Sequence, residues 1–352
     1  WDGVTAISGS SLLLAALDET SLDSIACQEF IQGGVIYEDR TLFQKVRKLH
    51  PASYYYYENG CLTKQDCYWS IDRLKPESLD GVEAVEAVKY AVQTTARKIG
   101  SLFSKPLCDL TGGYDSRTLV AGFLSVGIPV ATAVAGSTES PDVRISSALA
   151  NLAGLSHIHS DPEPIHSYEQ IRNALALTDG EYDILEYARV LEIHKQAAEK
   201  FDATLNGSFG EVARGYWWEI LVPHVGKRQK LDARRTARLR YLPRGFDSTL
   251  FPSGQRINLE EHYAAVIDRT NAGLENSPNT FQLDNIYLRL RMQRWQGRIA
   301  SSTNQIWPCL SPFMFRSVLE AMLQTKHNLR RRSLLIRKLL PELDDRFSQY
   351  PL

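Results

Sequence analysis

Residues 110–117 place two glycines among hydroxyl and carboxylate side chains, a combination that could bind a phosphate together with a metal ion. The stretch is Leu110-Thr111-Gly112-Gly113-Tyr114-Asp115-Ser116-Arg117. A glycine turn that leads into a helix presents free backbone N–H groups and a positive helix end, and both attract anionic oxygen. Asp115 would repel a phosphate directly, so we expect it to bind a hard cation such as Mg²⁺ that accompanies the phosphates.

The flanking residues predict how this turn is positioned. Residues 106–110 form a short apolar run typical of a buried strand, and Ser116 opens an apolar-periodic helix. The turn lacks the Lys of a Walker A loop and does not have GxGxxG spacing. The alternative interpretation is an ordinary strand–helix turn that contains a pair of glycines.

Strands and helices alternate along much of the chain. We expect further strands at 128–135, 156–159 and 203–206, helices at 80–100, 140–154 and 174–200, and a helical remainder at 259–352. This alternation predicts an α/β fold with a doubly wound parallel sheet, a helical C-terminal part and a small N-terminal remnant. Ligands of such sheets bind beyond the carboxyl ends of the strands, where residues 111–116 and 135–137 both lie.

The composition excludes several classes of protein. The chain has 352 residues, a net charge of −1 and no apolar run long enough to span a bilayer. A near-neutral charge argues against a surface devoted to nucleic acid, so we do not expect a nucleic-acid partner. The five cysteines are odd in number, irregularly spaced and without a CxxC motif. They favour reduced thiols and a cytoplasmic location.

Two segments together carry a resemblance to a known family. The glycine turn resembles the pyrophosphate loop (PP-loop) of ATP pyrophosphatases, SGGxDS, with Thr111 in place of the first Ser. An upstream segment resembles the lead-in TLF..I.KL.PG.y…YW of glutamine-dependent asparagine synthetases, which other PP-loop enzymes lack. The matching residues are Thr41, Leu42, Phe43, Val46, Lys48, Leu49, Pro51, Tyr68 and Trp69. The chain thus resembles the asparagine synthetase-like family, whose members include β-lactam synthetase and lasso peptide cyclase.

The resemblance implies a set of site residues. ATP contacts would come from Leu110, Thr111, Gly112, Gly113, Asp115, Ser116, Arg117, Val134, Ala135, Gly136 and Gly207. Among these, Val134 and Ala135 would bind adenine through their backbone. Asp115 and Glu211 would hold Mg²⁺, and the catalytic residues would be Glu211, Arg332 and Arg337.

Four departures from the family pattern concern this site. The family loop GdGaDElfgGY corresponds to residues 207–216, where Ser208 replaces the first Asp and the second Asp has no counterpart. Glu211 therefore remains as the acidic candidate, and the alternative is a solvent-facing Glu at a helix start. The phosphate-binding Lys of the family falls on Ser333, beside Arg332, and Ser311 replaces an acidic residue.

The resemblance also implies a domain division and a reaction. Residues 79–352 would be the ATP-binding synthetase domain, and residues 1–78 the end of a truncated amidotransferase-like lobe and its tether. A small-molecule or peptide carboxylate would attack the α-phosphate of ATP and release pyrophosphate, and ammonia or an amine would then displace AMP. Because Trp1 stands first and Cys27 lies in an expected helix, we expect this chain not to use glutamine. A homodimer and a separate N-terminal partner both stay open.

Two other functions stay open. A tRNA-modifying PP-loop enzyme is favoured by the basic residues of segment 223–245, although a solvated helix explains them more simply. A degenerate family member would bind a nucleotide, or a protein partner, without catalysis.

Overall fold

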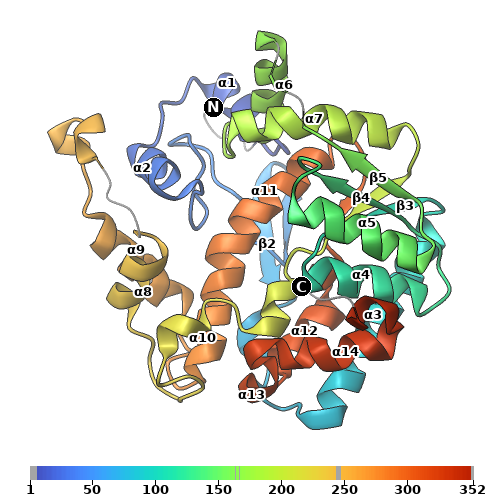
Figure 1. The fold of residues 1–352 in the computed structure, drawn as a ribbon. Helices are drawn as coiled ribbons and strands as arrows, with labels where there is room; N and C mark the ends of the chain where they lie inside the picture. The colour runs from blue at the N-terminus through green and yellow to red at the C-terminus, as the bar shows by residue number, and fades with distance from the viewer. Residues whose placement is uncertain (1–5, 163, 166, 243–246, 350–352) are drawn as a thin grey trace. The chain divides into compact units, whose positions relative to one another are not determined.

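The computed structural model describes residues 6–162, 164–165, 167–242 and 247–349, and its contacts divide the chain into two compact units (Figure 1). The sheet unit comprises the described parts of Lys75–Leu177, Leu185–Gly226 and Ile299–Leu352. The helical unit comprises those of Trp1–Leu74, Thr178–Ile184 and Lys227–Arg298. Trp1 and residues 243–245 of the basic segment lie outside the described residues.

The sheet unit is built on a five-stranded sheet in which every neighbouring pair is parallel. Its strands are β3 (Pro106–Asp109), β4 (Ala131–Ala135), β5 (His157–Ser160), β6 (Ala203–Leu205) and β7 (Cys309–Leu310). Their spatial order is β5-β4-β3-β6-β7. The chain therefore builds outward from β3 to β5, then returns to the other side of β3 for β6 and β7. This order is compatible with a doubly wound parallel fold, and its direction reverses between β3 and β6.

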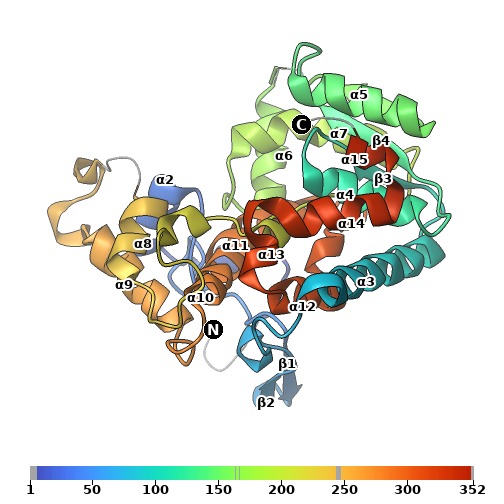
Figure 2. The ribbon, with the colours of Figure 1, turned by 60° about the horizontal axis from the view of Figure 1, so that its bottom comes forward.

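Helices connect and cover these strands. They are α3 (Gly81–Leu102), α4 (Tyr114–Leu124), α5 (Pro141–Ala153), α6 (Tyr168–Thr178), α7 (Ile184–Ala198), α12 (Arg316–Gln324), α13 (His327–Arg330), α14 (Leu334–Asp344) and α15 (Arg346–Gln349). Helix α5 lies against β4 and β5 (Figure 1), and α3 lies beside α4 and α14 (Figure 2). Helix α3 begins at the Asp80 cap, as expected, and buries Val85, Val88 and Ile99 along one face.

The helical unit combines the start of the chain with a segment from its middle. It holds α1 (Ser11–Asp18), α2 (Ser24–Gly33), the hairpin β1 (Ser53–Glu58) and β2 (Cys61–Cys67), α8 (Ala233–Arg240), α9 (Leu259–Thr270) and α10 (Asn279–Ile286). A π-helical turn, Tyr287–Met292, leads from α10 into α11 (Gln293–Thr303), which runs on into the sheet unit. None of the described helices of either unit is both long enough and apolar enough to span a membrane.

Fully buried Glu29 of α2 joins the segments of the helical unit. Its carboxylate accepts the N–H of Tyr37 at 2.9 Å and lies 2.6 Å from Nε2 of His262 in α9. Tyr37, Tyr241 and Tyr263 pack around each other with ring centroids 5.5 Å apart. The core of this unit is therefore shared between residues before 74 and residues after 227.

Most expected elements occur, and two expectations about elements were wrong. The expected helix 174–200 is broken, because Asp179 adopts a left-handed φ of 51° and its carboxylate accepts the Ser10 hydroxyl at 2.6 Å. The expected helical remainder contains β7, which pairs with β6. The predicted domain boundary at residue 78 stays a prediction. The contacts group residues 227–298 with the start of the chain.

Candidate functional site

Two hydroxyl groups hold the glycine turn in shape. The N–H of buried Leu110 still pairs with the Ala133 carbonyl of β4 at 2.8 Å, and the chain turns immediately afterwards. Ser116 Oγ accepts the Thr111 N–H and lies 3.0 Å from Thr111 Oγ1, which in turn accepts the Gly113 N–H at 3.1 Å. Both hydroxyl residues therefore shape the turn from within.

The start of α4 can receive an anion. Its N-cap is Gly113, and no side chain caps its first turn, so the first N–H groups lack the acceptor that a capping residue would supply. In the turn itself, the Gly112 N–H donates to Asp142 Oδ1 at 2.9 Å. An anionic oxygen from the first turn of α5 thus already binds one N–H of this turn, a contact that the sequence analysis did not include.

The loop after β6 lies directly on the first turn of α4. A Cβ atom added at Gly207 would stand 2.8 Å from the Ser116 nitrogen, and one at Gly210 would stand 2.7 Å from the Asp115 side chain. Only glycine leaves room for so close an approach. The 3-10 turn Gly210–Arg214 follows, and it brings Arg214 into contact with Asp115 and Glu211 near enough for its charge to act on Asp115.

Asp115 and Glu211 each have one carboxylate oxygen that is buried and unsatisfied. Oδ1 of Asp115 and Oε2 of Glu211 are both buried and lack a hydrogen-bond partner among the described residues. Burial raises the pKa of Asp115 to about 6, the Arg214 charge opposes this rise, and the Glu211 charge adds to it. Because Oε2 of Glu211 is buried, this oxygen does not face solvent, contrary to the alternative interpretation.

This donor set fits a hard cation that brings further ligands with it. The described residues contain no group of three or more His, Cys, Asp or Glu side chains able to hold a metal alone. Mg²⁺ commonly binds one or two carboxylates and completes its octahedron with substrate phosphates and water. Two buried carboxylate oxygens without partners, beside an uncapped helix start, match that requirement.

Arg214 belongs to this site although the sequence did not predict it. Its NH2 atom lies 2.6 Å from Asp115 Oδ2, and its side chain is 30% exposed. Its Nε is buried without a hydrogen-bond partner among the described residues. The family loop has a small glycine at this position, so only the departure from that pattern could have drawn attention to it.

Arg330 of α13 fixes the backbone of the turn that carries these residues. Its Nε donates to the Val212 carbonyl at 2.7 Å, and a second guanidinium N–H donates to the same oxygen. The guanidinium carbon also lies 4.5 Å from the centre of the Trp218 ring. Because Arg330 is 2% exposed, these contacts position the turn from the protein interior.

The predicted adenine edge lies at the end of β4. The Gly136 N–H donates to the Ser160 carbonyl, and the Gly136 carbonyl accepts from His159 Nε2 at 2.6 Å. Both backbone groups of Gly136 are therefore engaged by β5. Val134 is buried and Ala135 is exposed, so Ala135 remains the accessible part of this edge.

Three predicted arginines stand apart from the carboxylates. Arg117 is 1% exposed and donates to the Phe347 carbonyl at 3.3 Å, so its guanidinium is held within the fold. Arg332 and Arg337 are exposed, and no described carboxylate pairs with either. The turn Arg331–Ser333 and α14 both pack near Gly210–Arg214, but the structure does not bring the two side chains to Asp115.

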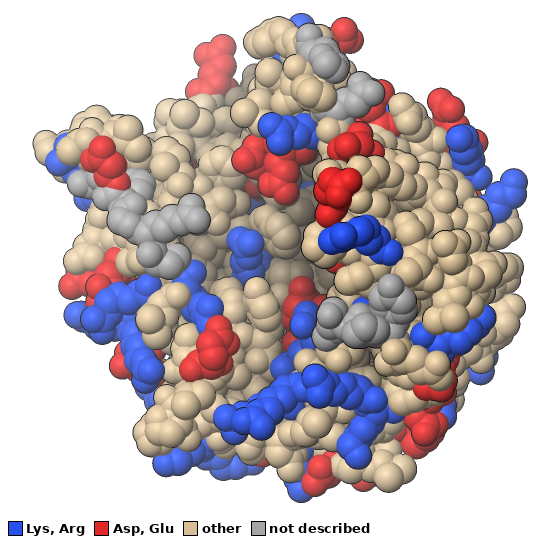
Figure 3. Space-filling model, viewed as in Figure 1, with Lys and Arg blue, Asp and Glu red and all other residues tan. Residues whose placement is uncertain are grey.

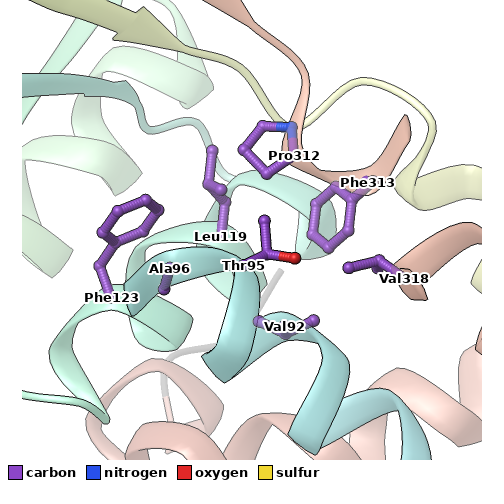
Figure 4. A pocket seen from close by; sticks show the side chains of 8 residues that line it. All are labelled: Val92, Thr95, Ala96, Leu119, Phe123, Pro312, Phe313 and Val318. Carbon is purple, nitrogen blue, oxygen red and sulfur yellow. The ribbon is translucent and has the colours of Figure 1, made fainter. Parts of the chain in front are cut away.

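Two further features do not extend the site. A small gap between α3, α4 and α12 is lined by apolar side chains and by the buried Thr95 (Figure 4), which suits packing and not a charged ligand. In the helical unit, the basic residues Lys230, Arg234 and Arg238 pair with acidic residues of α9. Basic and acidic side chains also lie side by side over the face drawn in Figure 3.

Two comparisons with known proteins were made for this chain. A scan against models of protein families found no match, and a search of curated proteins found none either.

Proposed function

We propose that this chain is an ATP-dependent carbon–nitrogen ligase of the asparagine synthetase-like, PP-loop type. It would join a substrate carboxylate to AMP, release pyrophosphate, and transfer the acyl group to ammonia or an amine. The carboxylate would belong to a small molecule or a peptide. The five cysteines are all free, which supports a reducing, cytoplasmic setting for this reaction.

One observation carries the proposal: two buried carboxylate oxygens without partners stand beside an uncapped helix start. Asp115 and Glu211 supply the oxygens, and α4 supplies the N–H groups. The site lies next to the point between β3 and β6 where the strand order reverses, the usual location of a ligand in such sheets. A nucleotide polyphosphate with Mg²⁺ would satisfy both the oxygens and the N–H groups.

Each residue has a definable task in this reaction. The first turn of α4 would bind phosphate oxygens and accept the charge that develops on the leaving pyrophosphate. Asp115 and Glu211 would hold Mg²⁺, which when bound neutralises phosphate charge. Thr111 and Ser116 keep the turn rigid, and Ala135 at the exposed end of β4 would orient the base.

The test is exchange of labelled pyrophosphate into ATP, run with Mg²⁺ and pools of carboxylates. The adenylation step is reversible before the amine attacks, so a ligase should return label to ATP only when a suitable carboxylate is present. Formation of AMP, measured separately, distinguishes this cleavage from the release of ADP. Production of ADP with any accepted substrate would refute the AMP-forming assignment.

A nucleotide-binding protein without catalysis is the second candidate. It is favoured by the Asp115–Arg214 ion pair, which neutralises one predicted metal ligand, and by the single acid in the loop after β6. Tight ATP binding without AMP formation, across the same carboxylate pools, would select this candidate. The paired basic residues of α8 give no support to a tRNA substrate.

A further inference from the structure

Three polar atoms without partners belong to the Asp115–Arg214 ion pair and to Glu211, whose charge acts on Asp115. They are Asp115 Oδ1, Glu211 Oε2 and Arg214 Nε, each buried and without a hydrogen-bond partner among the described residues. Buried polar atoms are nearly always paired, so each such atom calls for an explanation. Here two are acceptors and one is a cationic donor.

This combination is complementary to one kind of ligand. The two carboxylate oxygens need a cation, whereas the guanidinium N–H needs an acceptor. A metal-bound polyphosphate offers both, because its metal meets the carboxylates and its phosphate oxygens meet the guanidinium. A simple monovalent anion would leave the carboxylates unsatisfied, and a bare metal ion would leave the guanidinium unsatisfied.

We propose that Arg214 binds the polyphosphate of the nucleotide while it holds the carboxylate of Asp115 in place. This inference rests on the proposed nucleotide site and names the cation that contacts the phosphates. A guanidinium carries five N–H donors, so the 2.6 Å contact to Asp115 Oδ2 leaves others for a phosphate. The 30% exposure of the Arg214 side chain leaves it accessible to a ligand.

Arg214 fits this task better than the arginines expected from the sequence. Arg332 and Arg337 are exposed, and no described carboxylate orients either of them. Arg214 is oriented by Asp115. Arg330 holds the 3-10 turn that carries Arg214, because it donates to the Val212 carbonyl. An oriented cation loses less freedom on binding than one that is free to move.

The experiment measures equilibrium binding of ATP, ADP and AMP to the complete chain by titration calorimetry with Mg²⁺ present. In Arg214→Gln we expect roughly ten- to hundredfold weaker binding of ATP and ADP, the scale of a charge-assisted contact. AMP binding should change by less than about threefold, since AMP lacks the β- and γ-phosphates. Arg316→Gln is the matched control, because it removes an ion pair to Glu320 on α12, and it should bind ATP like the wild type.

The outcomes separate this inference from the proposed function. If the wild type binds ATP and Arg214→Gln binds it equally well, the Arg214 inference fails while the nucleotide site stands. Equal weakening of ATP and AMP would also overturn it, since that pattern indicates a general disturbance of the site. If the wild type does not bind ATP, both fail; if it binds ATP without pyrophosphate exchange, only the ligase assignment fails.

A second variant guards against misfolding of Arg214→Gln. Arg214→Lys keeps the charge but lacks the planar fork, so it should bind ATP at least about threefold more weakly while binding AMP normally. Thermal unfolding of both variants establishes that they are folded. A folded Arg214→Lys with wild-type affinity for ATP, together with an unfolded Arg214→Gln, would assign Arg214 a structural role and overturn the proposal.

Discussion

The two oxygens of Asp115 have different surroundings. Arg214 neutralises Oδ2, whereas Oδ1 is buried without a partner and lies within the electrostatic influence of Glu211. Because Arg214 holds Oδ2, the other oxygen of this carboxylate, Oδ1, keeps a fixed direction. The residue can therefore act as a metal ligand of defined direction.

Replacing either acid should affect the reaction more than the fold. We expect Asp115→Asn and Glu211→Gln each to lower Mg²⁺-dependent pyrophosphate release roughly 100-fold or more, the scale of losing one preorganised charged group. Glu342→Gln, which removes an exposed acid of α14, is the control and should be fully active. Pyrophosphate release and circular dichroism are measured on each variant. Unchanged release by Asp115→Asn would show that this carboxylate is not a metal ligand.

At the residue scale, the sequence predicts contacts between residues that are close in the chain. It does not predict contacts between residues that meet only when the chain folds. Asp115 and Gly112 lie in one continuous turn, so their proximity needs no tertiary structure. Arg214 and Asp142 reach the same turn from other strands and helices, and nothing in their local sequence identifies the partner. Arg214 stands alone among apolar and glycine residues, and arginines are mostly surface residues, so its sequence neighbours give no sign of a buried carboxylate partner.

At the scale of elements, the loop after β6 and the first turn of α4 form one packed unit. We expect Gly207→Ala to lower the free energy of unfolding by about 1–3 kcal/mol, because the added methyl group would meet backbone atoms that cannot rotate away. ATP binding should weaken as well, since the loop carries Glu211. Urea unfolding and calorimetry measure the two effects.

Gly254→Ala is the matched control for this substitution. A Cβ atom at Gly254 meets nothing within 4 Å, so its replacement should leave stability within about 0.5 kcal/mol of the wild type. If Gly207→Ala were as stable and as active as Gly254→Ala, the two elements would not be in the close contact described here.

Helix α7 contributes a titratable contact near the sheet. Burial lowers the pKa of His194 to about 4, and Nδ1 of its ring accepts the Trp307 Nε1–H at 3.4 Å, two residues before β7. In the unfolded chain this imidazole has a pKa near 6.5, so the unfolded state takes up the proton first as the pH falls. The contribution of neutral His194 is complete above pH 6.5 and is lost as the pH falls from there to about 4.

This titration predicts an acid-dependent loss of stability. Urea unfolding at pH 7.5, 6, 5 and 4.5 should show the loss, and His194→Gln should flatten it by up to about 3 kcal/mol at the acid end. His50→Gln removes an exposed histidine of the other unit and serves as the comparison. An equal loss of unfolding free energy between pH 6 and 4.5 in the wild type and in His194→Gln would contradict this account.

Element lengths decided which strands could be predicted. The expected strands at 106–110, 128–135 and 203–206 occur in shortened form, and the one expected at 156–159 occurs shifted by one residue, at 157–160. Strand β7 has two residues, too few for any periodicity, and it forms because β6 offers a free edge. The break between α6 and α7 falls on Asp179-Gly180, an Asp-Gly turn signal with both residues at positive φ, and Ser10 adds a hydrogen bond from far away in the sequence.

At the scale of the whole chain, the helical unit is made from segments far apart in the sequence. The family resemblance predicts one domain at 79–352, and the α/β pattern does not indicate which helices pack away from the sheet. Tyr241 and Tyr263 pack on Tyr37, and His262 contacts Glu29, so residues 227–298 depend on the start of the chain.

This dependence predicts the behaviour of a shortened chain. Residues 79–352 alone should expose the aromatic rings of Tyr241 and Tyr263, bind a hydrophobic dye, and lose protease resistance within 227–298. Addition of a separate 1–78 segment should restore part of this resistance. A fragment 79–352 that unfolds in one transition and resists protease like the full chain would instead support the division at residue 78.

The interleaved order of the two units also governs events during synthesis. Glu29 and Tyr37 leave the ribosome long before His262 and Tyr263, since residues 75–226 must be made in between. At ordinary rates of translation this interval lasts roughly 10–45 s. During that time the sheet unit has most of its strands, whereas the first 74 residues wait without the helices that complete their core. The beginning of the chain is therefore the part that a nascent-chain chaperone would have to shield, and among the last parts to become folded.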